Sequence, residues 1–182
     1  MSRLKVFLSL CLLASGVSII PGCDADGVGD PCVPEDEYVD TFSGFALSEA
    51  STESRSFQCQ SRLCLVNHFQ GRVSCPYGQV AEGGGCTLPG GLEPVRTAVR
   101  PQLLDRRAQD AVYCSCRCDG PDPDARYCEC PSGFSCSKVV PNFELGAEQL
   151  PGSYCIREGS DYSPVRVGAS ACDTRLENCQ FE

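Results

Sequence analysis

The chain has 182 residues with 24 acidic and 15 basic side chains, so its formal net charge is −9. It lacks the basic stripe that phosphate contacts require, which excludes nucleic acid as a partner. It contains 16 cysteines, 18 glycines, 13 prolines, one methionine and no tryptophan. This composition predicts an exported domain that is held together by disulfides more than by an apolar core.

The first 23 residues have the pattern of an export signal. Two basic residues precede an apolar run over residues 6–20, which ends in Ile20-Pro21-Gly22-Cys23. A charged start, a hydrophobic run and a small-residue end are the three parts of a signal peptide. The last four residues are similar to a bacterial lipobox, in which the cysteine receives the lipid. The resemblance implies that residues 1–22 form a lipoprotein signal peptide, and that acyl chains such as palmitate on Cys23 anchor the protein to an envelope membrane, inner or outer.

The cysteine count agrees with this processing. Cys11 leaves with the signal and Cys23 carries the lipid, so fourteen of the 16 cysteines remain, an even number that allows complete pairing. The disulfide candidates are Cys32, Cys59, Cys64, Cys75, Cys86, Cys114, Cys116, Cys118, Cys128, Cys130, Cys136, Cys155, Cys172 and Cys179. Eight cysteines alone allow about 105 pairings, so the connectivity stays open.

The mature chain divides into three parts by composition. Residues 23–40 are predicted to be an acidic tether, because glycine and proline interrupt them. Residues 41–158 are predicted to form one small disulfide-rich domain, mainly β or irregular with little helix. Residues 159–182 are predicted to be a mobile C-terminal segment, in which Cys172 and Cys179 could close a local loop.

Four acidic side chains of the tether have the spacing of a calcium-binding loop. Asp24, Asp26, Asp30 and Glu35 place oxygens at loop positions 1, 3, 7 and 12, and the stretch is similar to a thrombospondin type 3 unit. Val28 supplies no side-chain oxygen at position 5, and two prolines interrupt the loop. An acidic spacer without a bound metal is therefore the favoured interpretation.

Short strands and turns are expected along the domain. Partial alternation of apolar residues indicates an extended segment within residues 42–64, and alternation over residues 95–99 indicates a half-exposed strand. The apolar run at 63–66 predicts a hairpin with residues 72–75, and the only helix candidate is Leu103–Val112.

The densest cysteine group lies between Cys114 and Cys136. The strand period of two places the three cysteines of Cys114–Cys118 on one face, and those of Cys128–Cys130 on one face of a returning strand. Residues 119–124 between them are turn formers. Neighbours in a Cys-x-Cys sequence rarely bond to each other without strain, so bridges should run between the strands or to more distant cysteines. The segment Cys128–Cys136 is similar to the closing half of an EGF-like module.

The same cluster admits an alternative function. Cys-x-Cys repeats occur in metal-thiolate proteins, so Cys114–Cys136 could serve a metal-binding or thiol-redox protein. No Cys-x-x-Cys occurs, and the only histidine, His68, falls in a predicted loop. We therefore predict no enzyme activity, no catalytic residue, no metal site and no cofactor. Counting free thiols in the native protein distinguishes the two functions, because a cross-linked binding module has essentially none.

A family resemblance rests on several motifs together. They are the lipobox, Gly29-Asp30-Pro31-Cys32, Arg55-Ser56-Phe57-Gln58-Cys59, Cys75-Pro76-Tyr77-Gly78 and the stretch from Tyr113 to Cys136. With them the chain resembles uncharacterised cysteine-rich lipoproteins predicted in myxobacteria. The resemblance implies a location in the bacterial cell envelope and no particular reaction.

Loops on a rigid scaffold are where binding usually takes place. We expect a non-catalytic binding or structural module of unknown ligand, which presents the loops Asn67–Gly71, 83–91 and 119–124. The loops are polar or acidic, so the expected partner is a basic or polar protein or ligand. The membrane is the other partner, reached through the lipid anchor.

Substitution of Cys23 tests the anchor. We expect Cys23→Ala to block processing or to release the protein from the membrane, because no other group would carry the acyl chains. Intact-mass measurement of the mature protein should find an acylated cysteine at its start. An unmodified N-terminus at another residue would contradict the prediction.

Overall fold

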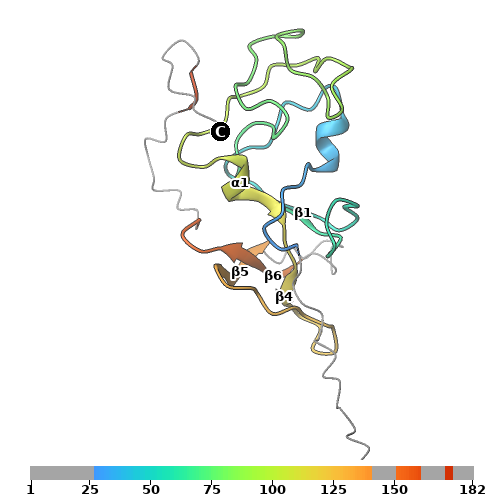
Figure 1. The fold of residues 1–182 in the computed structure, drawn as a ribbon, viewed down its shortest axis with the longest axis vertical. Helices are drawn as coiled ribbons and strands as arrows, with labels where there is room; N and C mark the ends of the chain where they lie inside the picture. Colours follow the sequence, from blue (N-terminus) through green and yellow to red (C-terminus); the bar gives the residue numbers. More distant parts are fainter. Residues whose placement is uncertain (1–26, 141–150, 161–170, 174–182) are drawn as a thin grey trace, which may run out of the picture.

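Two small antiparallel sheets carry the fold of the computed structural model, which describes residues 27–140, 151–160 and 171–173 (Figure 1). The first sheet has the order β1-β2-β3 and consists of β1 (Ala50–Glu53), β2 (Cys64–Asn67) and β3 (Val112–Cys114). The second has the order β4-β6-β5 and consists of β4 (Arg117–Asp119), β5 (Phe134–Val140) and β6 (Gly152–Arg157). The helices are the 3-10 turn η1 (Glu35–Tyr38) and α1 (Ala108–Ala111). The predicted disulfide-rich, mainly β or irregular fold with little helix is confirmed.

The apolar run at residues 63–66 becomes the central strand of the first sheet. All four residues of β2 are buried, because β1 and β3 pair with it from either side. The expected hairpin with residues 72–75 is wrong. Gly71 instead exchanges both backbone hydrogen bonds with Phe45, at 2.8 and 3.0 Å, which turns the chain away from β2.

The two sheets share a core through the short link between β3 and β4. Ser115 donates its backbone N–H to the Leu63 carbonyl and its hydroxyl to the Cys155 carbonyl, at 3.0 and 2.8 Å. The apolar cluster at this junction combines side chains from or beside β2, β3 and β6: Leu63, Leu65, Tyr113, Tyr154 and Ile156. The junction therefore fixes the second sheet against the first.

The chain from Gly27 to Asp40 is bonded to the folded body, first to the first sheet and then to the irregular lobe, and does not form the tether expected over residues 23–40. Gly29 donates to the Cys114 carbonyl and Cys114 donates to the Asp30 carbonyl, both at 2.8 Å. Cys32 is disulfide-bonded to Cys64 of β2. Residues 23–26 lie outside the described part of the chain.

Described residues of the predicted C-terminal segment are also held in place. Ala171 forms an isolated β-bridge with Leu103, and Cys172 donates its N–H to the Gln102 carbonyl at 2.9 Å. Cys172 is disulfide-bonded, whereas Cys179 of the predicted Cys172–Cys179 loop lies outside the described residues. Residues 171–173 are therefore part of the folded body.

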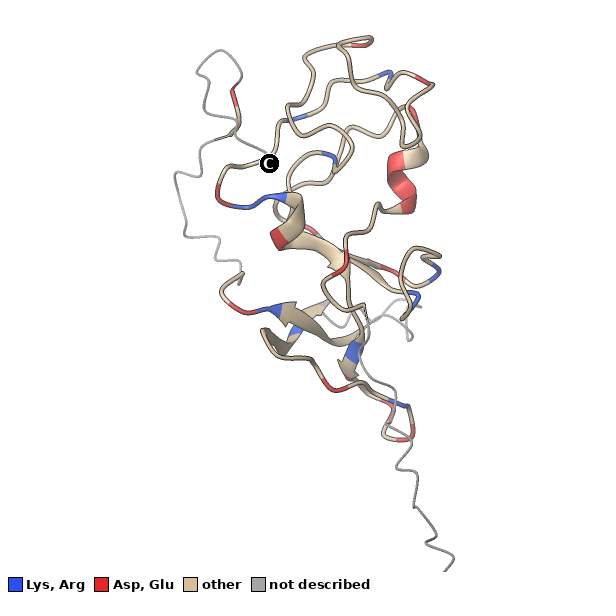
Figure 2. Cartoon of the chain, in the orientation of Figure 1, with Lys and Arg blue, Asp and Glu red and all other residues tan. Residues whose placement is uncertain are grey.

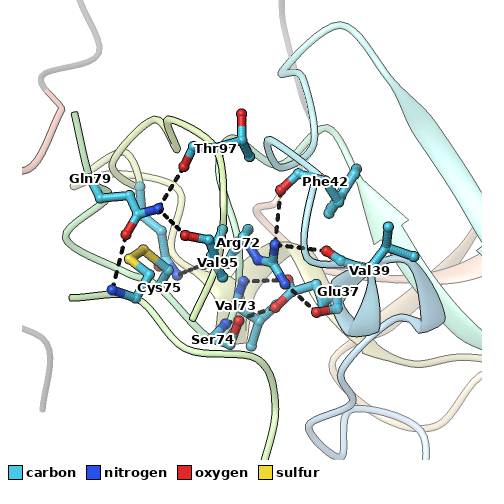
Figure 3. Close-up of a disulfide and its surroundings, with 12 residues drawn as sticks. Glu37, Val39, Phe42, Arg72, Val73, Ser74, Cys75, Gln79, Val95 and Thr97 are labelled. Atoms are coloured by element: carbon cyan, nitrogen blue, oxygen red, sulfur yellow. Dashed lines mark hydrogen bonds between the residues drawn. A yellow bond between two sulfur atoms is a disulfide. The ribbon is translucent and has the colours of Figure 1, made fainter. Parts of the chain in front are cut away.

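A buried acid and a buried arginine organise the irregular lobe around η1 (Figure 3). The Glu37 carboxylate accepts hydrogen bonds from the backbone N–H groups of Val73 and Ser74. The Arg72 guanidinium donates to the carbonyls of Glu37, Val39 and Phe42. Burial lowers the pKa of Arg72 and the negative charge of Glu37 raises it. The two side chains thus join residues 37–42 to residues 72–74 without a regular strand.

Buried glutamine side chains also join irregular segments to one another, within and after the loop closed by the Cys75–Cys86 disulfide. Gln79 donates to the carbonyls of Val95 and Thr97 at 2.9 and 2.6 Å, and accepts from the Cys86 N–H at 3.1 Å. Gln102 donates to the Arg72 carbonyl at 3.0 Å. These bonds satisfy backbone groups that no sheet reaches.

Two expected elements are shorter than the sequence indicates. Val95 and Val99 are buried and Arg96 is exposed, as predicted, but this segment makes only isolated bridges and is not a named strand. The helix expected over Leu103–Val112 is confined to the single turn of α1. No helix of the described residues is long and apolar enough to cross a membrane.

Replacing the buried arginine should separate its role from that of a surface arginine. We expect Arg72→Met to lower the free energy of unfolding by about 3–5 kcal/mol, because the Glu37 carboxylate stays buried without its neighbouring cation. The control is Arg96→Met, whose side chain is 60% exposed and forms a 3.3 Å ion pair with Asp40. For Arg96→Met, the free energy of unfolding measured in urea should fall by less than about 1 kcal/mol. Equal losses of unfolding free energy in the two variants would contradict the stabilising role of Arg72.

Candidate functional site

Six cysteines of the second sheet and its loop form one group of three disulfides. The pairs are Cys116–Cys128, Cys118–Cys136 and Cys130–Cys155. Cys118–Cys136 joins β4 to β5, and the other two join the loop over residues 120–133 to Cys116, just before β4, and to β6. Twelve of the fourteen candidate cysteines occur in the six disulfides described, the others being Cys32–Cys64, Cys59–Cys114 and Cys75–Cys86. Such a framework is typical of an oxidising, extracytoplasmic compartment.

Sulfur atoms of different disulfides lie close together in this group. The Cys155 Sγ is 3.6 Å from the Cys116 Sγ and 3.7 Å from the Cys128 Sγ. The sulfurs of Cys118, Cys130 and Cys155 all lie within 4.8 Å of one another. All three disulfides are therefore connected through Cys155 and its bonded partner.

A second sulfur group lies in the first sheet. The sulfurs of Cys32, Cys59 and Cys114 lie within 4.8 Å of one another, although the residues belong to two disulfides. Cys114 thus bonds away from Cys116 and Cys118, because β3 ends at Cys114 and β4 begins a different sheet. The expected single face of three cysteines is wrong. The returning segment 128–130 is also not a strand, since β4 pairs with β6.

His68 lies directly after β2 and not at a hairpin tip. Its Nδ1 is 3.0 Å from the Leu47 carbonyl oxygen, and its own carbonyl accepts a 2.6 Å bond from Arg106. Burial lowers the pKa of His68, and the nearby positive charge of Arg106 lowers it further, whereas the bond to Leu47 raises it.

The loop Asn67–Gly71, expected to face a partner, is largely inside the protein. Asn67 and Phe69 are buried, and Arg106 closes the loop by donating to the carbonyls of Asn67 and His68 at 2.6 Å each. The other two expected loops are exposed. Residues 121–124 and 82–85 lie on the surface.

The calcium candidates are only partly described. Asp24 and Asp26 lie outside the described residues. Asp30 uses its backbone to pair with Cys114, and the Glu35 N–H donates to the Glu53 carboxylate at 3.0 Å. Within the described residues, the groups of three side chains close enough to share a metal ion consist of cysteines only.

Two cavities open on the described surface. The larger, of about 1430 Å³, lies between residues 43–49 and 77–101 and reaches residues 171–173. The smaller, of about 700 Å³, lies beside η1 and is lined by Tyr38, Glu53 and Phe57 among others. Burial raises the pKa of the Glu53 carboxyl, the Glu35 N–H opposes this shift, and the charges of Glu35 and Asp36 add to it.

Comparison of the chain with protein-family models, with curated proteins and with solved structures found no match.

The lowered pKa of His68 predicts a pH dependence of stability. A group with a depressed folded pKa stabilises the protein fully above its ordinary value of about 6.5, and this contribution is lost as the pH falls below that value. Asn is the matched replacement because His68 has a φ of 53°, a conformation that Asn tolerates. We expect His68→Asn to lose less stability than the native protein between about pH 7 and pH 5, measured by urea unfolding. Identical losses would contradict the prediction.

Proposed function

We propose that the protein is a lipid-anchored, non-catalytic binding module of the bacterial cell envelope. Acyl chains on Cys23 hold it at a membrane, and the cross-linked body presents loops to a partner. The export signal and the six disulfides support the location. The chemistry of a partner is inferred below from exposed apolar side chains and from charge.

The observation that carries the proposal is the exposure of large apolar side chains on loops that disulfides or a backbone hydrogen bond hold in place. Phe57 is 88% exposed, Val80 96% and Leu92 95%. Phe57 lies two residues before Cys59, which is bonded to Cys114 of the sheet. Val80 lies within the loop closed by Cys75–Cys86, and Leu92 lies in a turn whose ends are joined by the 2.8 Å bond from Leu88 to Glu93. Exposed apolar groups on fixed loops are suited to contact a partner at a small entropic cost.

Charge indicates the kind of partner. Loss of the signal removes two basic residues, so the mature chain has 13 basic and 24 acidic side chains, a net charge of −11. Acidic side chains occur on η1 and along the loop between β4 and β5 (Figure 2). Glu35 and Asp36 of η1 and Asp122 and Asp124 of that loop are exposed. A basic or polar protein is therefore the favoured partner, and an anionic polymer is disfavoured.

A metal-thiolate function is the rival proposal for the same cysteines. It requires free thiolates, because a cysteine bonded to another sulfur is not an anionic ligand. Cys116, Cys128 and Cys155 have the proximity that three metal ligands would need, but all three are paired in the structure. Stoichiometric zinc or copper in freshly purified protein, lost in Cys116→Ser, would favour the rival.

Photo-crosslinking tests the binding proposal. A photoreactive amino acid at position 57, 80 or 92 should crosslink to the same partner in cells that produce the protein. Positions 138 and 158, which are exposed in or just after the strands of the second sheet and lie outside the loops expected to contact a partner, serve as controls. Crosslinking to a basic partner should weaken at high salt because exposed charges are screened. Equal crosslinking from the control positions, or none from the three loops, would overturn the proposal.

A further inference from the structure

The two sulfur groups differ in their access to solvent. Cys32, Cys59, Cys64 and Cys114 of the first sheet are each no more than 3% exposed, so an external thiol cannot reach them in the folded protein. In the second sheet, Cys136 is exposed and its partner Cys118 is half-buried. The second group is therefore open to solvent, most of all at Cys136, while Cys128 is half-buried.

Burial increases from that exposed end into the second group. Cys130 is half-buried, and its partner Cys155 is fully buried. Cys118 has both of these sulfurs within 4.8 Å, and Cys155 in turn lies 3.6 Å from Cys116. Each disulfide thus lies beside the next one inward.

We propose that the three disulfides of this group form a thiol–disulfide exchange chain that begins at Cys136. An external thiol loses its proton to solvent, and the thiolate attacks the Cys136 Sγ. A mixed disulfide forms, the Cys118–Cys136 bond breaks, and its electron pair leaves on the Cys118 sulfur. The product is a Cys118 thiolate beside the Cys130–Cys155 bond.

Two further exchanges carry the thiolate inward. Cys118 attacks Cys130, which forms Cys118–Cys130 and releases Cys155 as a thiolate. Cys155 attacks Cys116, which forms Cys116–Cys155 and releases Cys128, whose sulfur takes a proton from solvent. Each step breaks one S–S bond and forms one, so the sequence is redox-neutral and consumes only the first thiol.

This chemistry would make the module responsive to thiols in the envelope. The Cys118–Cys136 bond joins β4 to β5, and Cys116–Cys128 closes the acidic loop onto the start of β4. After exchange both of these bonds are replaced, so the loop over residues 119–127 is no longer closed at Cys128. The inference does not depend on the proposed binding partner.

Glutathione is the probe for the exchange. Native, fully oxidised mature protein is incubated with equimolar glutathione at a pH of about 8.5, where a typical cysteine thiol is half-ionised. The sample is quenched with acid, alkylated with N-ethylmaleimide and mapped by mass spectrometry without reduction. We expect glutathione on Cys136, alkylation of Cys128, and peptides joined by Cys118–Cys130 and Cys116–Cys155.

Two outcomes would overturn the proposal. One is glutathione on Cys136 with alkylation confined to Cys118 and every other disulfide native. The other is no mixed disulfide at Cys136 while Cys75–Cys86, which has no sulfur neighbour among the groups described, is opened. Both are measured on the native chain, so neither depends on the folding of a variant.

A pair of double variants provides the matched comparison. Cys118→Ala/Cys136→Ala should lose alkylation of Cys128, because the exposed end of the chain is gone. Cys75→Ala/Cys86→Ala removes an isolated disulfide and should retain that alkylation. Alkylation of Cys128 in the first variant at the native level would show that glutathione enters elsewhere and would contradict the proposed order.

Discussion

The structure depends on the bonds from Arg72 to three backbone carbonyls that no strand reaches. One guanidinium donates to the Glu37, Val39 and Phe42 carbonyls, while the Glu37 carboxylate accepts from the adjacent backbone amides of Val73 and Ser74. A buried charge is costly unless its hydrogen bonds are made, so each side chain is stable only while the other segment stays in place. The consequence is a lobe of defined shape built almost entirely from irregular chain.

Disulfides hold the segments around the first sheet together, whereas polar side chains hold most of the irregular lobe together. Cys32–Cys64 and Cys59–Cys114 join the N-terminal segment and the loop after β1 to the first sheet, where apolar packing is also present. In the irregular lobe, Cys75–Cys86 closes only one loop, and Gln79, Gln102 and Arg106 bond the rest. Cross-links restrict the unfolded chain, whereas these hydrogen bonds select one folded arrangement.

Apolar patterns over a few residues predicted the features that depend on those residues alone. The apolar run at 63–66 marked a strand, and the alternation at Val95 and Val99 marked two buried side chains. The strand partners were not predictable, because β1 has the sequence Ala-Ser-Thr-Glu and no apolar alternation. The prediction that the loop after β2 is exposed is wrong for a similar reason. Its polar sequence indicates exposure, whereas Arg106, 39 residues from Asn67, and Phe45 bond its carbonyls inside the protein.

Cysteine spacing predicted a cross-linked cluster but not its division into two sulfur groups. The alternation of Cys114, Cys116 and Cys118 is uniform in sequence, yet the change of sheet between β3 and β4 sends Cys114 into a sealed group and the other two into an open one. Ser115 lies at this change of sheet, and its backbone N–H and its hydroxyl bond to the carbonyls of Leu63 and Cys155. A link of two residues, Ser115 and Cys116, thus lies between a group of buried disulfides and a group whose Cys136 is exposed.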